Sequence, residues 1–455
     1  MEAEGPTLDR ASSEHRIVPA SAILPAEVDQ DALRVLSRLQ RNGFEAYLVG
    51  GCVRDLILGR KPKDFDVATA AHPRQIKRLF RNGRIIGRRF RLVHVVYGDH
   101  VIETATFRGE PPGGRNGDDE DLLIVEDNVF GSAEEDARRR DFTINGLFYD
   151  PTAGVIHDWV EGLADLESGI LRTIGDPTVR MPEDPVRILR AIKFATRLGF
   201  RIEERTWAAM CDSAPGLLRC APPRVFEEIL RLLRSGTALG ALRMLRACGA
   251  LRVLLPSIDV HLGSRDDPDP RVHDRADAYW RLLEALDADV HAGAEPGPAV
   301  CLAVLFLRLV ERAAEEAEMP ADWGDLAERE IDAIAGPARL PRKAVEFTKR
   351  ILSVQRRFTQ PATKGFHPLL FLRSSEFPEA LELFRLRCAA WGQGWDVYEG
   401  WLERYRRALE IPDQEVDRQR AQGRRRRRGR RRRRGPKTEG GPIENESAAP
   451  GFPAS

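Results

Sequence analysis

The stretch Tyr47-Leu-Val-Gly-Gly-Cys-Val-Arg-Asp55 predicts a short buried strand, a tight turn and the start of a helix. Gly50 and Gly51 have no Cβ, so the backbone at this turn can bend sharply and approach a ligand closely. The helix that follows points unpaired N–H groups and the positive end of its dipole toward the turn. The sequence therefore predicts a phosphate-binding turn at Gly50 and Gly51.

A pair of acidic residues follows soon after this turn. Asp64 and Asp66 flank Phe65 in a second apparent strand. Successive side chains of a strand point to opposite faces, so both carboxylates are expected on one face and Phe65 in the core. A Gly-Gly turn is usually only a turn, and an isolated Asp-x-Asp is usually a solvated strand end. Together they predict a site for two Mg²⁺ ions, with Asp64 and Asp66 as metal ligands beside a bound triphosphate.

Gly50-Gly-x-Val-Arg-Asp55 followed by Asp64-x-Asp66 resembles the head of the polymerase-β-type nucleotidyltransferases of class II. This branch contains the CCA-adding tRNA enzymes and the bacterial poly(A) polymerases. The resemblance covers about residues 45–235. It implies an α/β head with a small mixed sheet, followed by an all-helical neck and body.

The composition along the chain predicts five segments. A chain of 455 residues is long enough for two or three domains. From about Pro182 to Glu410 the pattern is almost entirely helical, whereas the N-terminus is rich in Glu, Pro and Ser and the chain after Pro412 has little apolar content. We expect a disordered N-terminus at 1–25, a catalytic head at 26–180, a nucleotide-selecting and RNA-binding neck at 181–260, an RNA-binding body at 261–412, and a disordered Arg-rich tail at 413–455.

The charge is distributed unevenly. Residues 424–437 hold ten arginines and Lys437 without an acid, although the whole chain has a net charge of only +1. The rest of the chain therefore carries a net charge of −10, which favours a tail that contacts a polyanion. The six cysteines show no paired spacing, and no segment is apolar enough for a signal peptide or a membrane span. We expect a cytoplasmic protein that is not bound to a membrane.

Nucleotide addition requires attack of an RNA 3′-hydroxyl on the α-phosphate of a triphosphate, and a third carboxylate is commonly needed beside the first two. Glu103 is a candidate because an unpaired charge in the middle of an apolar strand needs a cation or a hydrogen-bonding partner. Asp141 is the second candidate, and it could instead bind Arg140 or a ribose. We prefer Glu103 as the third acid. The alternative is that Glu103 is only a residue on a solvated strand face.

Further residues are candidates for binding the nucleotide. Arg54 lies one turn into the predicted helix, where it could reach a triphosphate or pair with Asp55 at the surface. Arg139-Arg-Asp-Phe-Thr-Ile-Asn145 resembles the family motif that holds ribose and triphosphate, which implies roles for Arg140 and Asn145. The family usually has Ala after this Asn, and Gly146 at that position is expected to loosen the predicted helix.

Glu183-Asp-Pro-Val-Arg187-Ile-Leu-Arg190 resembles the nucleotide-selecting motif of the family. Asp184 and Arg187 lie three residues apart, on one helix face, and Arg190 lies one turn further on. The resemblance implies that Asp184 and Arg187 contact the edge of the incoming base. The alternative is a helix-capping acid with a salt bridge to Arg187.

Two features favour polyadenylation over CCA addition. Ile85-Ile-Gly-Arg-Arg-Phe-Arg-Leu-Val-His-Val95 resembles a signature segment of bacterial poly(A) polymerases, and the basic tail is similar to theirs. The sequence thus predicts a template-independent poly(A) polymerase that uses ATP and Mg²⁺ on RNA 3′ ends, with RNA-decay proteins as further partners. The alternatives are a CCA-adding enzyme and, more remotely, a non-catalytic RNA-binding protein. A small-molecule nucleotidyltransferase would have no use for the helical body and the tail.

Overall fold

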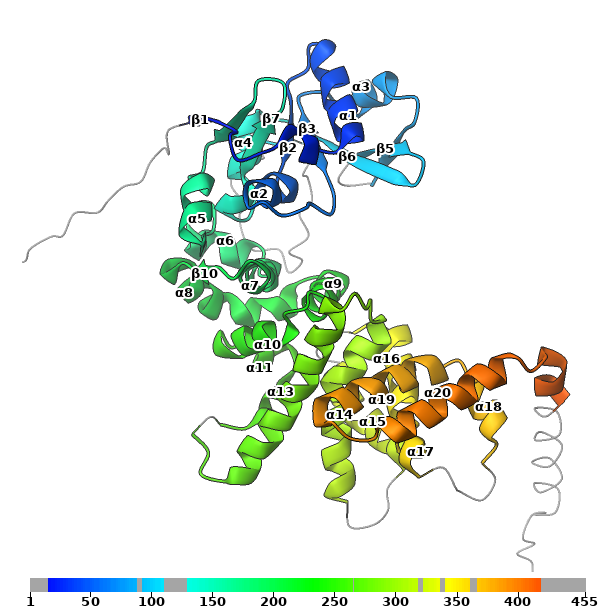
Figure 1. Ribbon diagram of the computed structural model, residues 1–455. Helices are drawn as coiled ribbons and strands as arrows, with labels where there is room; N and C mark the ends of the chain where they lie inside the picture. Colours follow the sequence, from blue (N-terminus) through cyan, green and yellow to red (C-terminus); the bar gives the residue numbers. More distant parts are fainter. Residues whose placement is uncertain are drawn as a thin grey trace, which may run out of the picture.

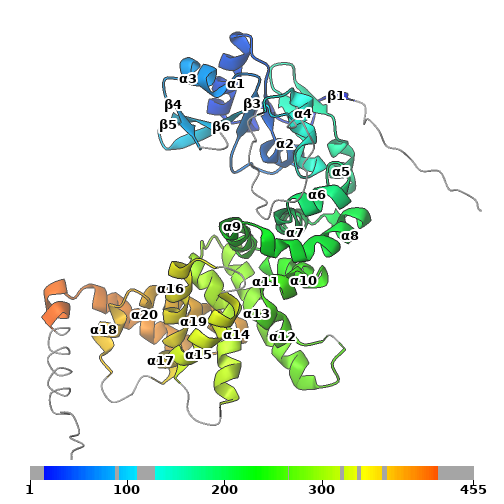
Figure 2. The ribbon, with the colours of Figure 1, turned by 180° about the vertical axis from the view of Figure 1, so that it is seen from behind.

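The computed structural model describes residues 15–87, 92–109, 129–264, 266–317, 322–335, 340–360 and 366–418. A sheet-containing head, a helical neck and a helical body follow one another along the molecule (Figure 1), and the view from behind shows the same succession (Figure 2). This arrangement confirms the predicted fold class of an α/β head followed by helices.

The head is built on one mixed sheet, which within the described residues has eight strands in the order β1-β8-β7-β2-β3-β6-β5-β4. Neighbouring strands are antiparallel except for β3 and β6, which are parallel. The strands are β1 (Arg16–Pro19), β2 (Ala46–Val49), β3 (Asp66–Thr69), β4 (Gly83–Ile86), β5 (Leu92–Tyr97), β6 (His100–Thr106), β7 (Leu147–Asp150) and β8 (Val155–Asp158).

Apolar side chains cover both faces of the central strands. In β2, Leu48 belongs to the large core that includes helix α1, whereas Tyr47 and Val49 belong to a smaller cluster with helix α4. The alternation along the strand accounts for this division. The helical segments of the head are η1 (Pro25–Glu27), α1 (Gln30–Arg41), α2 (Gly51–Ile57), α3 (Pro73–Leu79), α4 (Ala133–Arg138), η2 (Thr143–Asn145) and α5 (Gly162–Ser168).

The N-terminal segment departs from the prediction. Residues 1–25 were expected to be disordered, but Arg16–Pro19 forms β1 and pairs antiparallel with β8 at the edge of the sheet. Ile23 is buried in the core that follows. The prediction is wrong for residues 15–25, because this segment gains backbone hydrogen bonds from a strand about 140 residues away in the sequence, which local composition cannot indicate.

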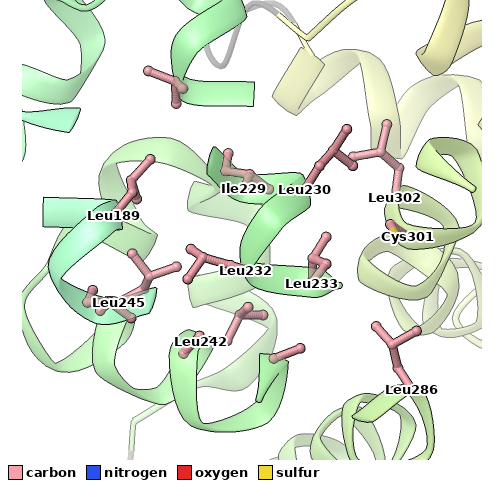
Figure 3. Close-up of a cluster of buried hydrophobic side chains, with 14 of the residues drawn as sticks. Leu189, Ile229, Leu230, Leu232, Leu233, Leu242, Leu245, Leu286, Cys301 and Leu302 are labelled. Carbon is pink, nitrogen blue, oxygen red and sulfur yellow. The ribbon is translucent and has the colours of Figure 1, made fainter. Parts of the chain in front are cut away.

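The neck packs around a continuous apolar core. Helix α7 contacts α9 and α10. Figure 3 shows how this core runs from Leu189 of α7, through Leu230 and Leu233 of α9, to Leu302 of α14 in the body. The segments from 170 to 262 are β9 (Ile170–Leu171), α6 (Pro177–Glu183), α7 (Val186–Leu198), β10 (Arg201–Ile202), α8 (Glu204–Ser213), η3 (Ala214–Arg219), α9 (Pro222–Leu233), α10 (Ala238–Ala247), α11 (Ala250–Leu254) and α12 (Pro256–Leu262).

The body is helical throughout its described residues, with the apolar helix α14 at its centre. Thirteen of the eighteen residues of α14 are buried. The helices are α13 (Pro270–His291), α14 (Pro298–Glu315), α15 (Trp323–Ala335), α16 (Arg342–Ser353), α17 (Arg356–Thr359), α18 (Pro368–Leu372), α19 (Phe377–Trp391) and α20 (Trp395–Leu409). In the part of the chain that the structure describes, none of the helices could cross a membrane.

The first residues of the predicted tail, 413–418, belong to the part of the chain that the structure describes. Residues 413–418 are helical, and Val416 is buried, so the expectation of disorder is wrong for this short stretch. The arginine run at 424–437 lies outside the described residues.

Candidate active site

A cavity of about 650 Å³ lies where the head meets helix α7 of the neck. Its walls come from the turn before α2, the start of β3, the segment after α4, and α7. It brings together residues that are far apart in the sequence. Of the predicted site residues, the following line it: Gly50, Gly51, Arg54, Asp64, Asp66, Arg140, Asp141, Asn145, Asp184, Arg187 and Arg190.

The Gly-Gly turn brings the backbone against an arginine. Gly50 is the N-cap of α2 and has φ 74°, a conformation that favours glycine. A Cβ at Gly50 would lie 2.9 Å from Nη1 of Arg140. The positive φ therefore favours Gly50, and the guanidinium of Arg140 lies next to the space that a Cβ would take.

The two acids stand on the cavity wall as the sequence suggested, with one difference. β3 begins at Asp66, so Asp64 lies in the segment just before the strand, and Phe65 between them is buried in the main core. Asp64 is exposed, whereas Asp66 is partly buried. Burial raises the pKa of Asp66 to about 6, and the charges of Glu103 and Asp64 add to this, while Arg140 opposes it. Asp66 is therefore a partly buried acid with two acidic neighbours and one opposing arginine.

Glu103 does not line the cavity, but it stands next to Asp66. The two residues are register partners in the parallel pair β3–β6, so their side chains are on the same face of the sheet. The Glu103 side chain is 51% exposed, so it lies on the solvated strand face that was the alternative and is not a buried charge. The proposal that it is the third acid therefore has a geometric basis in this pairing.

The donor set fits Mg²⁺, because Asp64, Asp66 and Glu103 offer only carboxylate oxygens, which this ion prefers. Among the described residues, these three are not gathered to within 4.8 Å of one another. The group that meets this distance is Asp29, Asp31 and His100. Asp29 there serves as the N-cap of α1, with Oδ1 accepting from the backbone N–H of Asp31.

Arg54 is the centre of a buried polar network. It is 2% exposed, and its Nε and Nη2 donate to Asp55 at 2.8 and 2.7 Å. Its Nη1 donates to Oδ1 of Asn145 at 2.6 Å. The alternative prediction, that Arg54 pairs with Asp55 at the surface, is therefore correct about the pair. It is wrong about the location, because the pair is buried at the cavity.

The network continues to the neck through Asp141. Nδ2 of Asn145 donates to Asp141, whose other oxygen lies 2.6 Å from Nη2 of Arg190 in α7. Burial opposes ionisation of Asp141, but Arg190, Asn145 and the N–H of Phe142 outweigh it and lower its pKa. Asp141 thus pairs with Arg190 rather than with Arg140.

Arg140 lies over the turn and follows helix α4, which ends at Arg138 rather than running through the motif as predicted. Its Nη2 donates to Asp136 at 2.9 Å, and its guanidinium stacks on the ring of Phe148, with 5.0 Å to the centroid. These contacts hold a positive charge at the Gly50 turn, next to Asp66.

The predicted pair of Asp184 and Arg187 is not a pair in the structure. Asp184 ends α6 and lies 2.7 Å from Nη2 of Arg224 in α9, whereas α7 begins at Val186. Arg187 donates to the carbonyl of Arg180 and lies 3.5 Å from Glu183. Burial and the charge of Arg180 lower the pKa of Arg187 to about 10. The expected shared helix face and the alternative salt bridge are both wrong.

The cavity also contains cations that the sequence analysis missed. Arg197 lies 3.3 Å from Asp55 and so joins α7 to the head a second time. Its spacing from Arg187 and Arg190 is that of one helix face, together with Phe194, so helical periodicity could have identified it. No comparable pattern indicates the other charged residues of the lining, which are Lys63, Arg108, Asp136, Arg139 and Arg231.

Carboxylates on a mixed sheet, facing a glycine turn and a group of arginines, define a nucleotidyltransferase. The head matches the family "Poly A polymerase head domain" over residues 46–172. Residues 199–262 match "Probable RNA and SrmB- binding site of polymerase A", and residues 314–435 match "Polymerase A arginine-rich C-terminus".

The chain belongs to the family of bacterial poly(A) polymerases. It is 38% identical over 383 residues to poly(A) polymerase I of Escherichia coli O6:H1, covering 80% of each chain. It is 45% identical over 250 residues to that of Haemophilus influenzae, covering 54% of this chain and 55% of the relative.

CCA-adding enzymes are related, but their sequences match a smaller part of this chain. The enzyme of Streptococcus mutans is 40% identical over 217 residues, which cover only 47% of this chain and 51% of the relative. A crystal structure of the Bacillus stearothermophilus CCA-adding enzyme in complex with CTP aligns with a TM-score of 0.60 and 27% identity, covering 84% of this chain and 82% of that one. The fold is thus common to both groups, whereas similarity along most of the sequence favours the poly(A) polymerases.

Proposed function

We propose that this chain is a template-independent poly(A) polymerase that transfers AMP from ATP to RNA 3′ ends. The observation that carries the proposal is the cavity between head and neck, which is lined by Asp64 and Asp66, a group of arginines and a glycine turn. Triphosphate needs such positive charge, and the metal ions that accompany it need the carboxylates.

Asp64, Asp66 and Glu103 would hold the two Mg²⁺ ions, which supply charge neutralisation at the attacking and leaving oxygens. The raised pKa of Asp66 supports this assignment, because crowded carboxylates gain most from a cation. Arg140, which lies over the Gly50 turn, would bind the triphosphate. Arg54 and Asn145 would act mainly as a rigid support, because Arg54 donates to both Asp55 and Asn145, and Asn145 in turn donates to Asp141.

Selection of ATP would depend on α7. Arg187 and Arg190 line the cavity from one face of this helix, and Arg187 can donate to ring or carbonyl acceptors of a base. Asp184 is held by Arg224, so we propose that it fixes the shape of the pocket and that Arg187 makes the contact with adenine.

RNA would cross the neck and body and contact the basic tail. The match of residues 199–262 to a site described as binding RNA and SrmB supports RNA binding there and makes an SrmB-type protein a candidate partner. Sequence-independent attraction to phosphate suits an enzyme that accepts many RNA ends. We place the activity in the cytoplasm, where ATP and RNA are available, and the six free cysteines agree with this.

The test is incubation of the purified protein with a labelled generic RNA, Mg²⁺ and each of the four nucleoside triphosphates in turn. We expect long tails with ATP alone, and none for Asp64→Asn. A chain that extends RNA equally with all four triphosphates, or a fully active Asp64→Asn variant, would contradict the proposal.

The competing function is CCA addition, because CCA-adding enzymes share this fold. A tRNA that lacks its 3′ end, offered with CTP and ATP and then sequenced, separates the two. We expect a run of A residues on this substrate. An added CCA end that terminates growth would favour the alternative.

A further inference from the structure

A row of polar residues crosses four strands of the head sheet beside the active site. Asp66 of β3 is the register partner of Glu103 in β6, Glu103 is the partner of His94 in β5, and His94 is the partner of Arg84 in β4. Partners across neighbouring strands have their side chains on the same face. The row therefore leads from the proposed metal site outward to the edge of the sheet.

The contact within this row is specific. Nε2 of His94 lies 3.4 Å from Oε1 of Glu103. The neighbours of His94 in the strand, Val93 and Val95, are fully buried on the opposite face, so the strand has no freedom to turn His94 away. The His94 side chain is itself 28% exposed, compared with 51% for Glu103. The imidazole is thus the better fixed of the two groups.

Glu103 needs such a partner. Its side chain is long and exposed, and it stands beside Asp66, whose negative charge repels it. Without a second contact, the carboxylate would turn toward solvent, because repulsion and side-chain entropy both favour that position. An N–H group on its far side can fix one oxygen and leave the other directed toward Asp66.

We propose that His94 is a positioning residue for the active site, which holds the Glu103 carboxylate in place for metal binding through its Nε2–H group. The inference rests on the proposed function, since it concerns the metal site of the same reaction. It also gives a physical role to the segment 85–95, whose described strand β5 reaches the active-site face with His94 next to Glu103.

The experiment measures metal binding directly, with Mn²⁺ as the probe. Titration calorimetry of Mn²⁺ in the presence of a non-hydrolysable ATP analogue is compared for the wild type, His94→Leu and His94→Gln. Loss of a partner behind a metal ligand usually weakens metal affinity 10- to 100-fold. We expect about tenfold weaker Mn²⁺ binding for His94→Leu. His94→Gln, which keeps an N–H donor, should restore most of it.

Kinetics give a second readout. The Mg²⁺ concentration that gives half-maximal activity should rise for His94→Leu, whereas kcat at saturating Mg²⁺ should change much less. Val96→Ala is the matched control, because Val96 is two residues along β5 on the same face and pairs with Val101 rather than with an acid. If a substitution acted only by disturbing the structure of β5, Val96→Ala would raise the required Mg²⁺ concentration as much as His94→Leu does.

The outcomes separate this inference from the proposed function. Unchanged Mn²⁺ affinity in His94→Leu, or a His94→Gln variant no better than His94→Leu, overturns the role of His94. If Asp66→Asn weakens Mn²⁺ binding in the same experiment, the proposed metal site stands even then. If Asp66→Asn also binds Mn²⁺ normally, the metal site itself is wrong.

Discussion

Replacement of Asp66 by Asn should stabilise the protein while abolishing its activity. The pKa of Asp66 is raised to about 6 in the folded state, compared with 3.8 for the free side chain. Between these values the folded protein holds a proton that the unfolded chain has released. Stability is therefore lost as pH rises through this window and stays low above it. Asn carries no charge and avoids this loss.

The magnitude follows from the shift. About two pH units correspond to about 3 kcal/mol at neutral pH, and partial exposure of the side chain reduces this to roughly 1–3 kcal/mol. For a cooperative unit that comprises the head and the neck, the melting temperature should rise by roughly 3–8 °C. Thermal unfolding at pH 7.5 measures the gain, and at pH 4 the variant and the wild type should melt together.

Asp64→Asn is the matched control. Asp64 lines the same cavity but is exposed, so its replacement should change stability by less than about 0.5 kcal/mol while it also abolishes activity. Mg²⁺ with an ATP analogue should stabilise the wild type and neither variant. If Asp66→Asn were no more stable than the wild type at pH 7.5, the electrostatic description of this site would be refuted.

Three further predictions concern packing, the neck and the tail. A Cβ at Gly146 would lie 2.6 Å from Cγ2 of Val160, so Gly146→Ala should destabilise the head by about 1–2 kcal/mol, and adding Val160→Ala should recover part of that loss in a double-mutant cycle of thermal unfolding. Asp141→Asn removes the buried partner of Arg190 and should cost about 1–3 kcal/mol by the same measurement; an unchanged melting temperature would mean that the ion pair is unimportant. Deleting residues 423–437 should weaken RNA binding and flatten its salt dependence in filter-binding titrations, with turnover per bound short RNA retained; unchanged affinity would exclude the tail from RNA binding.

Local pattern was sufficient to predict the fold class and the family. The Gly50-Gly51 turn and the acids after it are compact signals, because the residues that act together are close in the sequence. Glu103 could be proposed because a charge inside an apolar strand is unusual. Its position next to Asp66 was unpredictable, since it depends on the parallel pairing of β3 with β6.

What the sequence could not show is the choice of partners over long distances. Asp141 forms an ion pair with Arg190, and Asp184 forms one with Arg224, although other arginines lie much closer to each acid in the sequence. These choices depend on how α7 packs against the head and how α9 packs against α7, and packing is set by the whole core. Gly146 illustrates the same limit: it was expected to loosen a helix, but its role is to make room for Val160.

The two links between α7 and the head have a consequence for any attempt to divide the molecule. Asp55 and Asp141 are 4% and 8% exposed, and their cationic partners Arg197 and Arg190 come from the neck. A fragment that ends at residue 180 would keep both anions but lose both neck arginines, which would leave Asp55 with Arg54 alone and Asp141 without its ion-pair partner. Such a fragment would not be an autonomous folding unit. Helix α7, which supplies the cations, lies outside the head in the sequence but contributes to the stability of the head as well as of the neck.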